Sequence, residues 1–249
     1  MRLTRIYVAE PLSVGAEVAL PAGGAYHVVR VLRMRVGAAL RVFDGVGNEH
    51  RAEIGSIGGD KVQVRIGECI HGAPESNLQI TLVQGVSRSE RMDWTLQKAT
   101  ELGVATIAPV LTARSVVRLD DKQAAKKQEH WHSIVIGACE QCGRSVLPKV
   151  QKPLRLRDYL GHDYSGNARK EAMRLVLSPT APASLAGLNS LSTKVELLIG
   201  PEGGLDDDEV LSAEQAGFTP VRLGPRVLRT ETASVAALSV LQALWGDFR

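Results

Sequence analysis

The sequence has no apolar run close to the roughly 20 residues that a membrane-spanning helix needs, so we expect no membrane partner. Residues 1–12 lack the apolar segment and small-residue cleavage site of exported proteins, which favours a cytoplasmic location. Three cysteines are too few for a disulfide framework, and this fits a reducing compartment. The net charge of +3 is mild, so it permits an anionic partner without indicating one.

Several catalytic signatures are also missing. The sequence has no H-E-x-x-H, no G-x-S-x-G and no phosphate loop. Cys139 and Cys142 form a single C-x-x-C, with His130 and His132 a few turns earlier. A zinc site would need a second pair at ligand spacing, and a redox C-x-x-C normally begins a helix instead of ending one. We therefore expect no metal and interpret the two cysteines as incidental neighbours on a helix.

The composition, 44% hydrophobic and 23% charged, is typical of a globular protein, and 249 residues favour two domains. Residues 1–72 contain short candidate strands separated by glycine turns, and one helical pattern at residues 25–35. Residues 62–66 alternate apolar and polar side chains, which is typical of a half-buried strand. Many short strands in close succession favour a small barrel. The candidate strands are residues 5–8, 17–20, 40–44, 49–54 and 61–67.

The pattern changes after the linker-like residues 71–77, so we place a domain boundary there and assign residues 73–249 to a second domain. Apolar strands now alternate with longer helical patterns, which favours an α/β fold class with a mainly parallel sheet. The candidate strands are residues 78–86, 104–110, 175–177, 195–199 and 221–223.

Three helices of this domain have recognisable ends or faces. Ser89 is a candidate N-cap for the first, and Gly103 follows it. Asp206 and Glu209 have the spacing of a capping box at the start of a later helix. The last helix, about residues 232–244, is apolar on nearly every side. Such a helix is buried in its own domain or against a second subunit.

Two segments that follow strands are candidates for a ligand site. Residues 197–204 (LLIGPEGG) run from a buried strand into a glycine-rich turn, where open α/β sheets bind ligands. The spacing differs from both the Rossmann fingerprint and the phosphate loop, so a nucleotide phosphate is not the expected ligand. Residues 223–233 (LGPRVLRTETA) place polar groups beside an apolar helix, as small-molecule sites do. A tight turn without a ligand, and a helix capped by Thr230 or Glu231, are the structural alternatives.

Taken together and in this order, four segments resemble the RsmE family, the 16S ribosomal RNA uridine N3-methyltransferases of the SPOUT superfamily. The resemblance extends to residues 5–8 (RIYV), and so covers essentially the whole chain. The last two segments, at this spacing, are specific to the family. The four segments are residues 98–104 (KATELGV), 140–144 (EQCGR), 199–204 (IGPEGG) and 223–233.

The resemblance implies an α/β domain of the SPOUT type with a trefoil knot, preceded by a small PUA-like RNA-binding β-barrel. It also implies a homodimer that binds S-adenosyl-L-methionine in the knot loops and methylates N3 of a specific uridine in 16S ribosomal RNA of the small ribosomal subunit. The cofactor positions that it implies are Leu177, Ser178, Ile199, Gly200, Pro201, Glu202, Gly203, Gly204, Leu223, Gly224, Val227, Leu228, Thr232 and Ala233.

Methylation at N3 requires the loss of the imide proton, because the protonated nitrogen is a poor nucleophile. We expect Arg229 to stabilise the charge that develops on the uracil oxygens. Glu231 and Glu202 are candidates to orient this arginine or to accept the proton, and either can instead be structural. RNA contacts, with the target base turned out of its stack, are expected from basic residues spread along the chain. These are Arg5, Arg30, Arg33, Arg35, Arg114 and Arg144. For Arg114 and Arg144 the alternative is a contact with the partner subunit.

Two other classes of function remain open from the sequence. A non-enzymatic RNA-binding module would leave the glycine turn and residues 229–233 without a ligand. A different small-molecule enzyme would use the turn at residues 200–204 and ignore RNA. The basic run that contains Arg30, Arg33, Arg35 and Arg41 is compatible with a solvated face or with a phosphate backbone. Cofactor binding and salt-dependent RNA affinity distinguish these possibilities.

Overall fold

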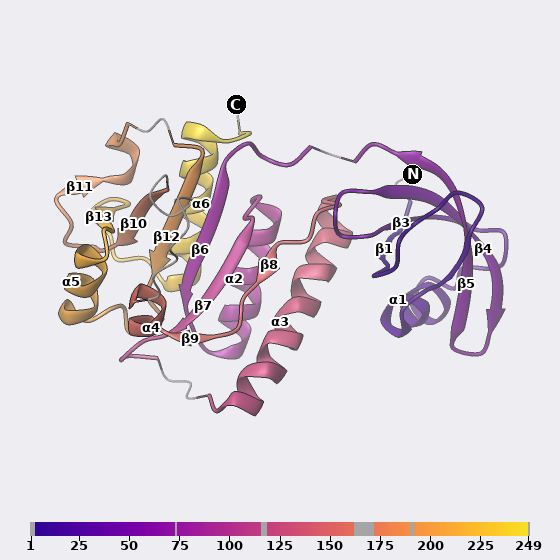
Figure 1. Cartoon of the computed structure of the whole chain (residues 1–249), viewed down its shortest axis with the longest axis horizontal. Helices are drawn as coiled ribbons and strands as arrows, with labels where there is room; N and C mark the ends of the chain where they lie inside the picture. Colours follow the sequence, from indigo (N-terminus) through magenta and orange to yellow (C-terminus); the bar gives the residue numbers. More distant parts are fainter. Residues whose placement is uncertain (1–2, 73, 116–118, 162–171, 190–191, 249) are drawn as a thin grey trace. The chain divides into compact units, whose positions relative to one another are not determined.

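The computed structural model describes residues 3–72, 74–115, 119–161, 172–189 and 192–248 (Figure 1). These residues divide into two compact units. The N-terminal unit comprises residues 1–75 and 136–147, and the C-terminal unit comprises residues 76–135 and 148–249. Helix α3 (Asp121–Cys142) therefore contributes residues to both units. In the part of the chain that the structure describes, no helix combines the length and the apolar character that crossing a bilayer would demand.

The N-terminal unit is built on a five-stranded sheet with the order β1-β3-β4-β5-β2. Strand β1 runs parallel to β3, and the other neighbours are antiparallel. The helix expected at residues 25–35 both begins and ends before those bounds. It consists of α1 (Ala22–Tyr26) followed by the π-helical turn η1 (His27–Val31). All five expected strands are confirmed. They are β1 (Arg5–Tyr7), β2 (Glu17–Ala19), β3 (Ala39–Phe43), β4 (Glu49–Gly58) and β5 (Lys61–Ile70).

A single apolar cluster fills this unit. Val62, Val64 and Ile66 of β5 are buried on one face, as their alternation with polar residues predicts. Strand β4 runs four residues beyond its expected end, because its register with β5 shifts between Ile54 and Ser56 and pairing then continues to Gly58. The cluster joins the sheet to α1 and η1.

A buried ion pair ties residues 136–147 into the N-terminal unit. The Arg5 guanidinium donates to both carboxylate oxygens of Glu49, at 3.1 Å from Nε and 2.9 Å from Nη2. It also donates to the carbonyl oxygens of Cys139 and Arg144. The Ser145 hydroxyl donates to Glu49 Oε2 at 2.7 Å. The pair thus connects β1, β4 and the end of α3.

This arrangement corrects two of the expected RNA contacts. The Arg5 side chain is 3% exposed, so it is enclosed and does not reach a phosphate. Arg144 is 11% exposed and pairs with the carboxylate of Glu75. Both arginines stabilise the N-terminal unit itself.

The two cysteines of the C-x-x-C lie at the end of α3, with Cys139 buried and Cys142 partly buried. A hydrogen bond from the Cys139 thiol outweighs the effect of burial and, with the nearby Arg144 charge, lowers the pKa of Cys142 to about 6. The same contact, together with burial, raises the pKa of Cys139. Within the described ranges, no group of three or more His, Cys, Asp or Glu side chains is arranged to hold a metal.

The C-terminal unit is an eight-stranded sheet with the order β11-β13-β10-β12-β6-β7-β8, and β9 pairs with β7. Its paired strands run parallel, which confirms the expected fold class. The carboxyl ends of β6, β10, β12 and β13 therefore share one edge (Figure 1). The strands are β6 (Gln79–Gly85), β7 (Thr106–Leu111), β8 (Lys149–Val150), β9 (Leu154–Arg155), β10 (Met173–Leu177), β11 (Ala183–Ser184), β12 (Lys194–Ile199) and β13 (Thr219–Arg222).

Helices cover both faces of this sheet. Val83 of β6 faces an apolar cluster that includes α4 (Leu156–Gly161) and α5 (Asp207–Gln215). The next residue, Gln84, points to the opposite face and contacts α6 (Thr230–Trp245). Helix α6 in turn packs against α2 (Ser89–Glu101). The short helix η3 (Leu185–Gly187) also contacts α6.

The helix ends test three predictions. The capping box of Asp206 and Glu209 is confirmed by hydrogen bonds in both directions. Gly103 has φ +78°, the left-handed conformation expected after α2. Ser89 is the first residue of α2, so the expected cap position is wrong by one residue: Arg88 stands there and its side chain makes no capping bond.

Glu49 gives the N-terminal unit a predictable response to acid. Burial alone raises the pKa of Glu49, but hydrogen bonds from Arg5 and Ser145, the Arg5 charge and a hydrogen bond from Arg41 together lower it below the ordinary value of 4.5. A carboxyl with a lowered folded-state pKa stabilises the fold above its unfolded pKa, and this stability is lost as pH falls through the folded value.

We expect Glu49→Gln to lower the free energy of unfolding at neutral pH by about 3–5 kcal/mol, because Arg5 stays buried without a counter-charge. Below pH 4.5, the variant should lose stability less steeply than the parent. Urea denaturation at several pH values measures both effects. The matched control is Glu68→Gln, whose ion pair with Arg51 is exposed and contributes at most about 1 kcal/mol. Equal losses in the two variants would contradict the role assigned to Glu49.

Candidate functional site

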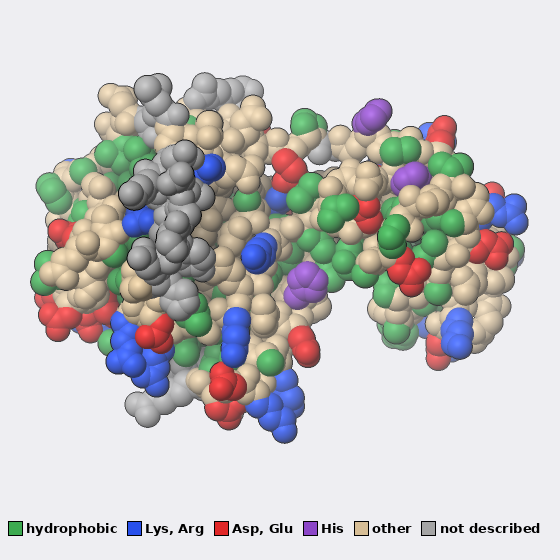
Figure 2. Space-filling view, viewed as in Figure 1, with side chains coloured by type: hydrophobic (Ala, Val, Ile, Leu, Met, Phe, Trp, Pro, Cys, Tyr) green, Lys and Arg blue, Asp and Glu red, His purple; other side chains and the backbone are tan. Residues whose placement is uncertain are grey.

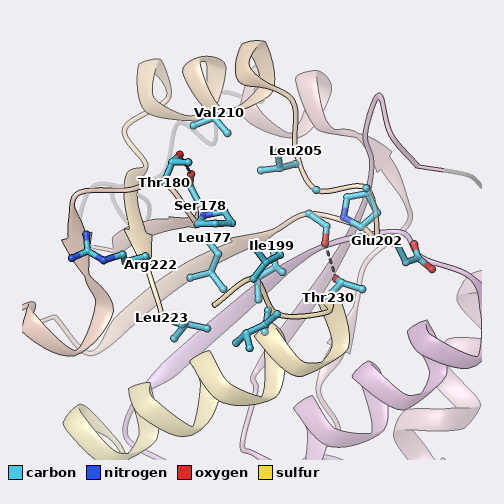
Figure 3. Close-up of a pocket in the computed structure, with 18 of the residues that line it drawn as sticks. Leu177, Ser178, Thr180, Ile199, Glu202, Leu205, Val210, Arg222, Leu223 and Thr230 are labelled. Atoms are coloured by element: carbon cyan, nitrogen blue, oxygen red, sulfur yellow. Dashed lines mark hydrogen bonds between the residues drawn. The ribbon is translucent and has the colours of Figure 1, made fainter. Parts of the chain in front are cut away.

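A cavity of about 380 Å³ opens at the carboxyl ends of β10, β12 and β13 (Figure 3). Its lining comes from the ends of three strands and the loops that follow them: residues 177–180 at the end of β10, residues 199–205 at the end of β12 and residues 221–228 at the end of β13. The first turn of α6 and Arg114 complete the wall. Three loops that are far apart in the sequence thus meet at the edge where open α/β sheets bind ligands.

The lining matches the positions expected for the cofactor, with one exception. Thr232 is exposed on α6 and is not among the described lining residues, because the side chains of α6 that face the cavity are those of Thr230 and Ala233. The other expected positions all line the cavity. Arg226 and Thr230 lie inside residues 223–233 but were not among the expected cofactor positions. The other missed lining residues lie outside the two segments singled out in the sequence: Pro179, Thr180, Leu205, Asp207, Val210, Val221 and Arg222.

The walls differ in chemistry. Leu177 at the end of β10, Ile199 at the end of β12 and Leu223 directly after β13 point into the cavity and form an apolar wall (Figure 3). Ser178 and Thr180 lie on the other side, and their hydroxyl oxygens are 3.1 Å apart. An apolar surface beside a few polar groups and loop backbone is the usual composition of a small-molecule site.

The glycine turn of residues 200–204 is packed tightly against the end of β6. A Cβ atom on Gly85 would lie 2.5 Å from the nitrogen of Pro201. A Cβ atom on Gly200 would lie 2.8 Å from the carbonyl carbon of Gly204, which itself has φ +70°. Glycine is therefore required for two reasons: close approach of one backbone to another, and a left-handed conformation.

Arg114 holds the same turn from the other side. Its Nη1 donates to the carbonyl oxygens of Gly203 at 3.0 Å and Leu205 at 3.3 Å. A Cβ atom on Gly203 would lie 3.0 Å from Cβ of Arg114. The structure thus places Arg114, which was expected to contact RNA, in the wall of the cavity.

Glu202 connects the turn to α2. Its Oε1 accepts a hydrogen bond of 2.9 Å from the backbone N–H of Arg88, the N-cap residue of α2. A carboxylate at this position satisfies a free donor and interacts favourably with the helix dipole. This contact supports the structural alternative for Glu202.

A small charged cluster surrounds Glu202. Arg91 Nη1 lies 3.6 Å from Oε1 of Glu202, and Arg91 Nε lies 3.9 Å from Oε1 of Glu231. The second carboxylate oxygen of each glutamate is buried and makes no hydrogen bond to the described part of the chain. Arg91 was missed by sequence reasoning, because an arginine on a helix gives no sign of carboxylates more than a hundred residues away.

The three expected catalytic residues are close in structure but not equivalent. Glu202 lines the cavity, whereas Arg229 and Glu231 are not among its described lining residues. Arg229 is exposed at the N-cap of α6, directly before Thr230. Glu231 is in the first turn of α6.

The expected RNA-contacting arginines of the N-terminal unit are accessible. Arg30, Arg33 and Arg35 are all exposed, and Arg30 makes an exposed ion pair with Asp60. Figure 2 shows basic and acidic side chains interspersed on the visible face of each unit. This distribution agrees with the mild net charge of +3.

Comparisons with known proteins agree with this geometry. The profile of a family described as an RNA methyltransferase domain matches residues 74–242, and one described as an RNA methyltransferase PUA domain matches residues 25–67. The ribosomal RNA small subunit methyltransferase E of Bacillus subtilis is 37% identical over 226 residues, which cover 87% of this chain and 86% of that protein. Its counterpart from Buchnera aphidicola (strain APS) is 32% identical over 248 residues, covering 100% and 96%.

Solved structures are similar over the same length. A ribosomal RNA small subunit methyltransferase E from Neisseria gonorrhoeae, bound to S-adenosyl methionine, has a TM-score of 0.92 and 40% identity, and each chain is covered completely. A protein of Legionella pneumophila in complex with the same cofactor has a TM-score of 0.93 and 40% identity, again with complete coverage. This chain therefore belongs to the ribosomal RNA small subunit methyltransferase E family.

Proposed function

We propose that this chain transfers a methyl group from S-adenosyl-L-methionine to N3 of a specific uridine in 16S ribosomal RNA of the small ribosomal subunit. The observation that carries the proposal is the meeting of the three loops around one cavity in a member of this family. A relative with 40% identity over its whole length is described as bound to this cofactor. A non-enzymatic RNA-binding module would have no use for such a cavity.

The residues of the cavity fit the cofactor. A volume of about 380 Å³ lies within the range of small-molecule sites. Leu177, Ile199 and Leu223 provide an apolar surface for the adenine ring, and the glycine turn allows close approach of backbone groups. When bound, S-adenosyl-L-methionine supplies a methyl group attached to a positively charged sulfur, and the rest of the cofactor is the leaving group, a neutral thioether.

Residues around the cavity would then act on the uracil. Arg229 stabilises the negative charge that develops on the uracil oxygens. Glu202 is engaged by the backbone of α2, so Glu231 is the carboxylate that orients Arg229 or accepts the N3 proton. Arg91 lies between the two glutamates and keeps both carboxylates close to a positive charge.

The N-terminal unit would hold the RNA. We assign RNA binding to the PUA-like domain of residues 1–72, whose compact unit also includes residues 136–147, and methyl transfer to residues 73–249. Exposed Arg30, Arg33 and Arg35 supply contacts to phosphates. The target base is turned out of its stack, because N3 lies on the edge that pairs.

Two finer features of the fold belong to this proposal. The first is a trefoil knot formed by the loops that line the cavity. It is supported by the strand order, in which β12 lies between β10 and β6. The second is a homodimer. Val235, Ala236 and Val240 of α6 are apolar and only half-buried, as expected for a helix that a second copy covers.

Isothermal titration with S-adenosyl-L-methionine tests the cofactor site. The wild-type chain should bind saturably, and Gly85→Ala should bind about 10- to 100-fold more weakly, because its methyl group would displace Pro201 from its close contact with β6. Gly187→Ala is the control, since no atom lies within 4 Å of the added methyl group. Absence of binding by folded wild-type chain would overturn the proposal and favour the RNA-binding module.

Nucleoside mass spectrometry tests the reaction, with 16S ribosomal RNA offered both bare and in small subunits. The expected product is N3-methyluridine. Arg229→Ala should lower kcat about 100-fold or more while leaving cofactor affinity unchanged. Glu231→Gln should lower kcat as well, whereas Glu202→Ala should mainly lower the melting temperature, because the backbone N–H of Arg88 at the start of α2 loses its acceptor. Methylation at another atom, or full activity of Arg229→Ala, would refute the assignment.

A further inference from the structure

A fully buried glutamine lies beneath the glycine turn. Gln84 is the sixth residue of β6, is 0% exposed and follows the apolar residues Leu82 and Val83. An amide in such surroundings destabilises the fold unless its donors and acceptor are hydrogen-bonded. Its contacts therefore show what the residue does.

The amide of Gln84 joins α6 to the turn through hydrogen bonds. Ser234 Oγ donates to Gln84 Oε1 at 2.8 Å. Gln84 Nε2 donates to Thr230 Oγ1 at 3.0 Å and to the carbonyl oxygen of Gly85 at 3.1 Å. Thr230 Oγ1 then donates to the carbonyl oxygen of Gly200 at 2.7 Å (Figure 3). The hydrogen bonds therefore connect α6 to β6, return from β6 to α6 at Thr230, and end at Gly200 in the turn that lines the cavity.

The direction of these bonds is determined by chemistry. The carbonyl of Gly85 accepts only, so the NH₂ group of Gln84 has to face it and the amide has one allowed orientation. In that orientation Gln84 donates to Thr230, whose own hydroxyl proton is left for Gly200. In the described part of the chain, Gln84 is thus the donor that leaves the Thr230 proton for Gly200.

The last two residues of β6 thus act together on the turn. Gly85 lets the Gly200–Pro201 peptide approach, since any Cβ there would lie 2.5 Å from Pro201 N. Gln84 sets the direction of the Gly200 carbonyl through Thr230. The next residue is proline and has no N–H, so this carbonyl is the hydrogen-bonding group of the Gly200–Pro201 peptide bond.

We infer that Gln84 is a positioning residue of the cofactor site: through Thr230 it holds the Gly200 carbonyl, and so keeps the turn of residues 200–204 in its binding shape. Gln84 does not line the cavity in the part of the chain that the structure describes, so its effect on affinity is indirect. The inference rests on the proposed function. A binding loop that is held in shape before the ligand arrives loses less entropy on binding.

The chain contains a matched control. Gln242 is also 0% exposed, lies in the last turns of α6 and is absent from the described lining of the cavity. It accepts from Ser76 Oγ at 2.9 Å and donates to the carbonyl oxygen of Leu102 at 2.8 Å. Gln84 and Gln242 are therefore chemically equivalent, and Gln84 alone of the two is connected to the turn.

The experiment compares Gln84→Met with Gln242→Met in the full chain. Both substitutions keep the length of the side chain and remove a buried amide, so both should lower the melting temperature. We expect Gln84→Met to raise the Kd for S-adenosyl-L-methionine about 10-fold or more, measured by isothermal titration at a temperature where each variant is folded. Gln242→Met should keep the wild-type Kd. Equal Kd values in the two folded variants would overturn the inference.

Two smaller changes keep the test decisive if Gln84→Met does not fold. Ser234→Ala removes the donor to Gln84 and leaves the described lining residues unaltered, so it should raise the Kd several-fold. Thr230→Val removes the hydroxyl that connects Gln84 to Gly200 and should also raise the Kd. A wild-type Kd in both Ser234→Ala and Thr230→Val would overturn the inference. Wild-type chain that is folded but does not bind would instead refute the proposed function.

Discussion

The close contact between the end of β6 and the Gly200–Pro201 peptide is the constraint on which the rest of the C-terminal unit depends. A side chain at Gly85 would occupy the space of Pro201. Because β12 pairs with β6 over six residues, the turn after β12 begins where β6 ends. Strand β10 pairs in parallel with β12 on one side and with β13 on the other. The loops after β10 and β13 therefore lie at the same edge of the sheet as the turn after β12. The cavity is the space that these loops enclose.

The charged and polar residues around the turn have divided roles. Glu202 and Arg114 hold the turn from outside, one through the N-terminus of α2 and the other through two carbonyl oxygens. Thr230 holds it from α6. Arg229 and Glu231 are not among the described lining residues of the cavity, and in the proposed function they act on the second substrate. A turn that is held in place beside polar side chains suits the proposed transfer between two bound molecules, because such a transfer requires both reactants to be oriented.

Much of this arrangement could be predicted from local sequence. Alternation in residues 62–66, the capping box at Asp206 and the glycine turn are local signals, and the structure confirms each of them. Arg5 and Glu49 are 44 residues apart, and an arginine in a strand gives no sign that it will be buried. Gln84 likewise looks like an ordinary polar residue at the end of a strand. Its role depends on partners 146 and 150 residues away, which periodicity does not detect.

The interleaving of the two units limits how this architecture can be rearranged. The Arg5–Glu49 pair is completed by Ser145 and by carbonyl groups at and after the end of α3, all supplied by a segment that follows two of the eight strands of the α/β sheet in the chain. A single recombination crossover at the linker of residues 71–77 would therefore transfer the PUA-like domain without the segment that completes it. A chimera would have to inherit residues 1–75 and 136–147 together, so we expect the two units to be inherited as one sequence.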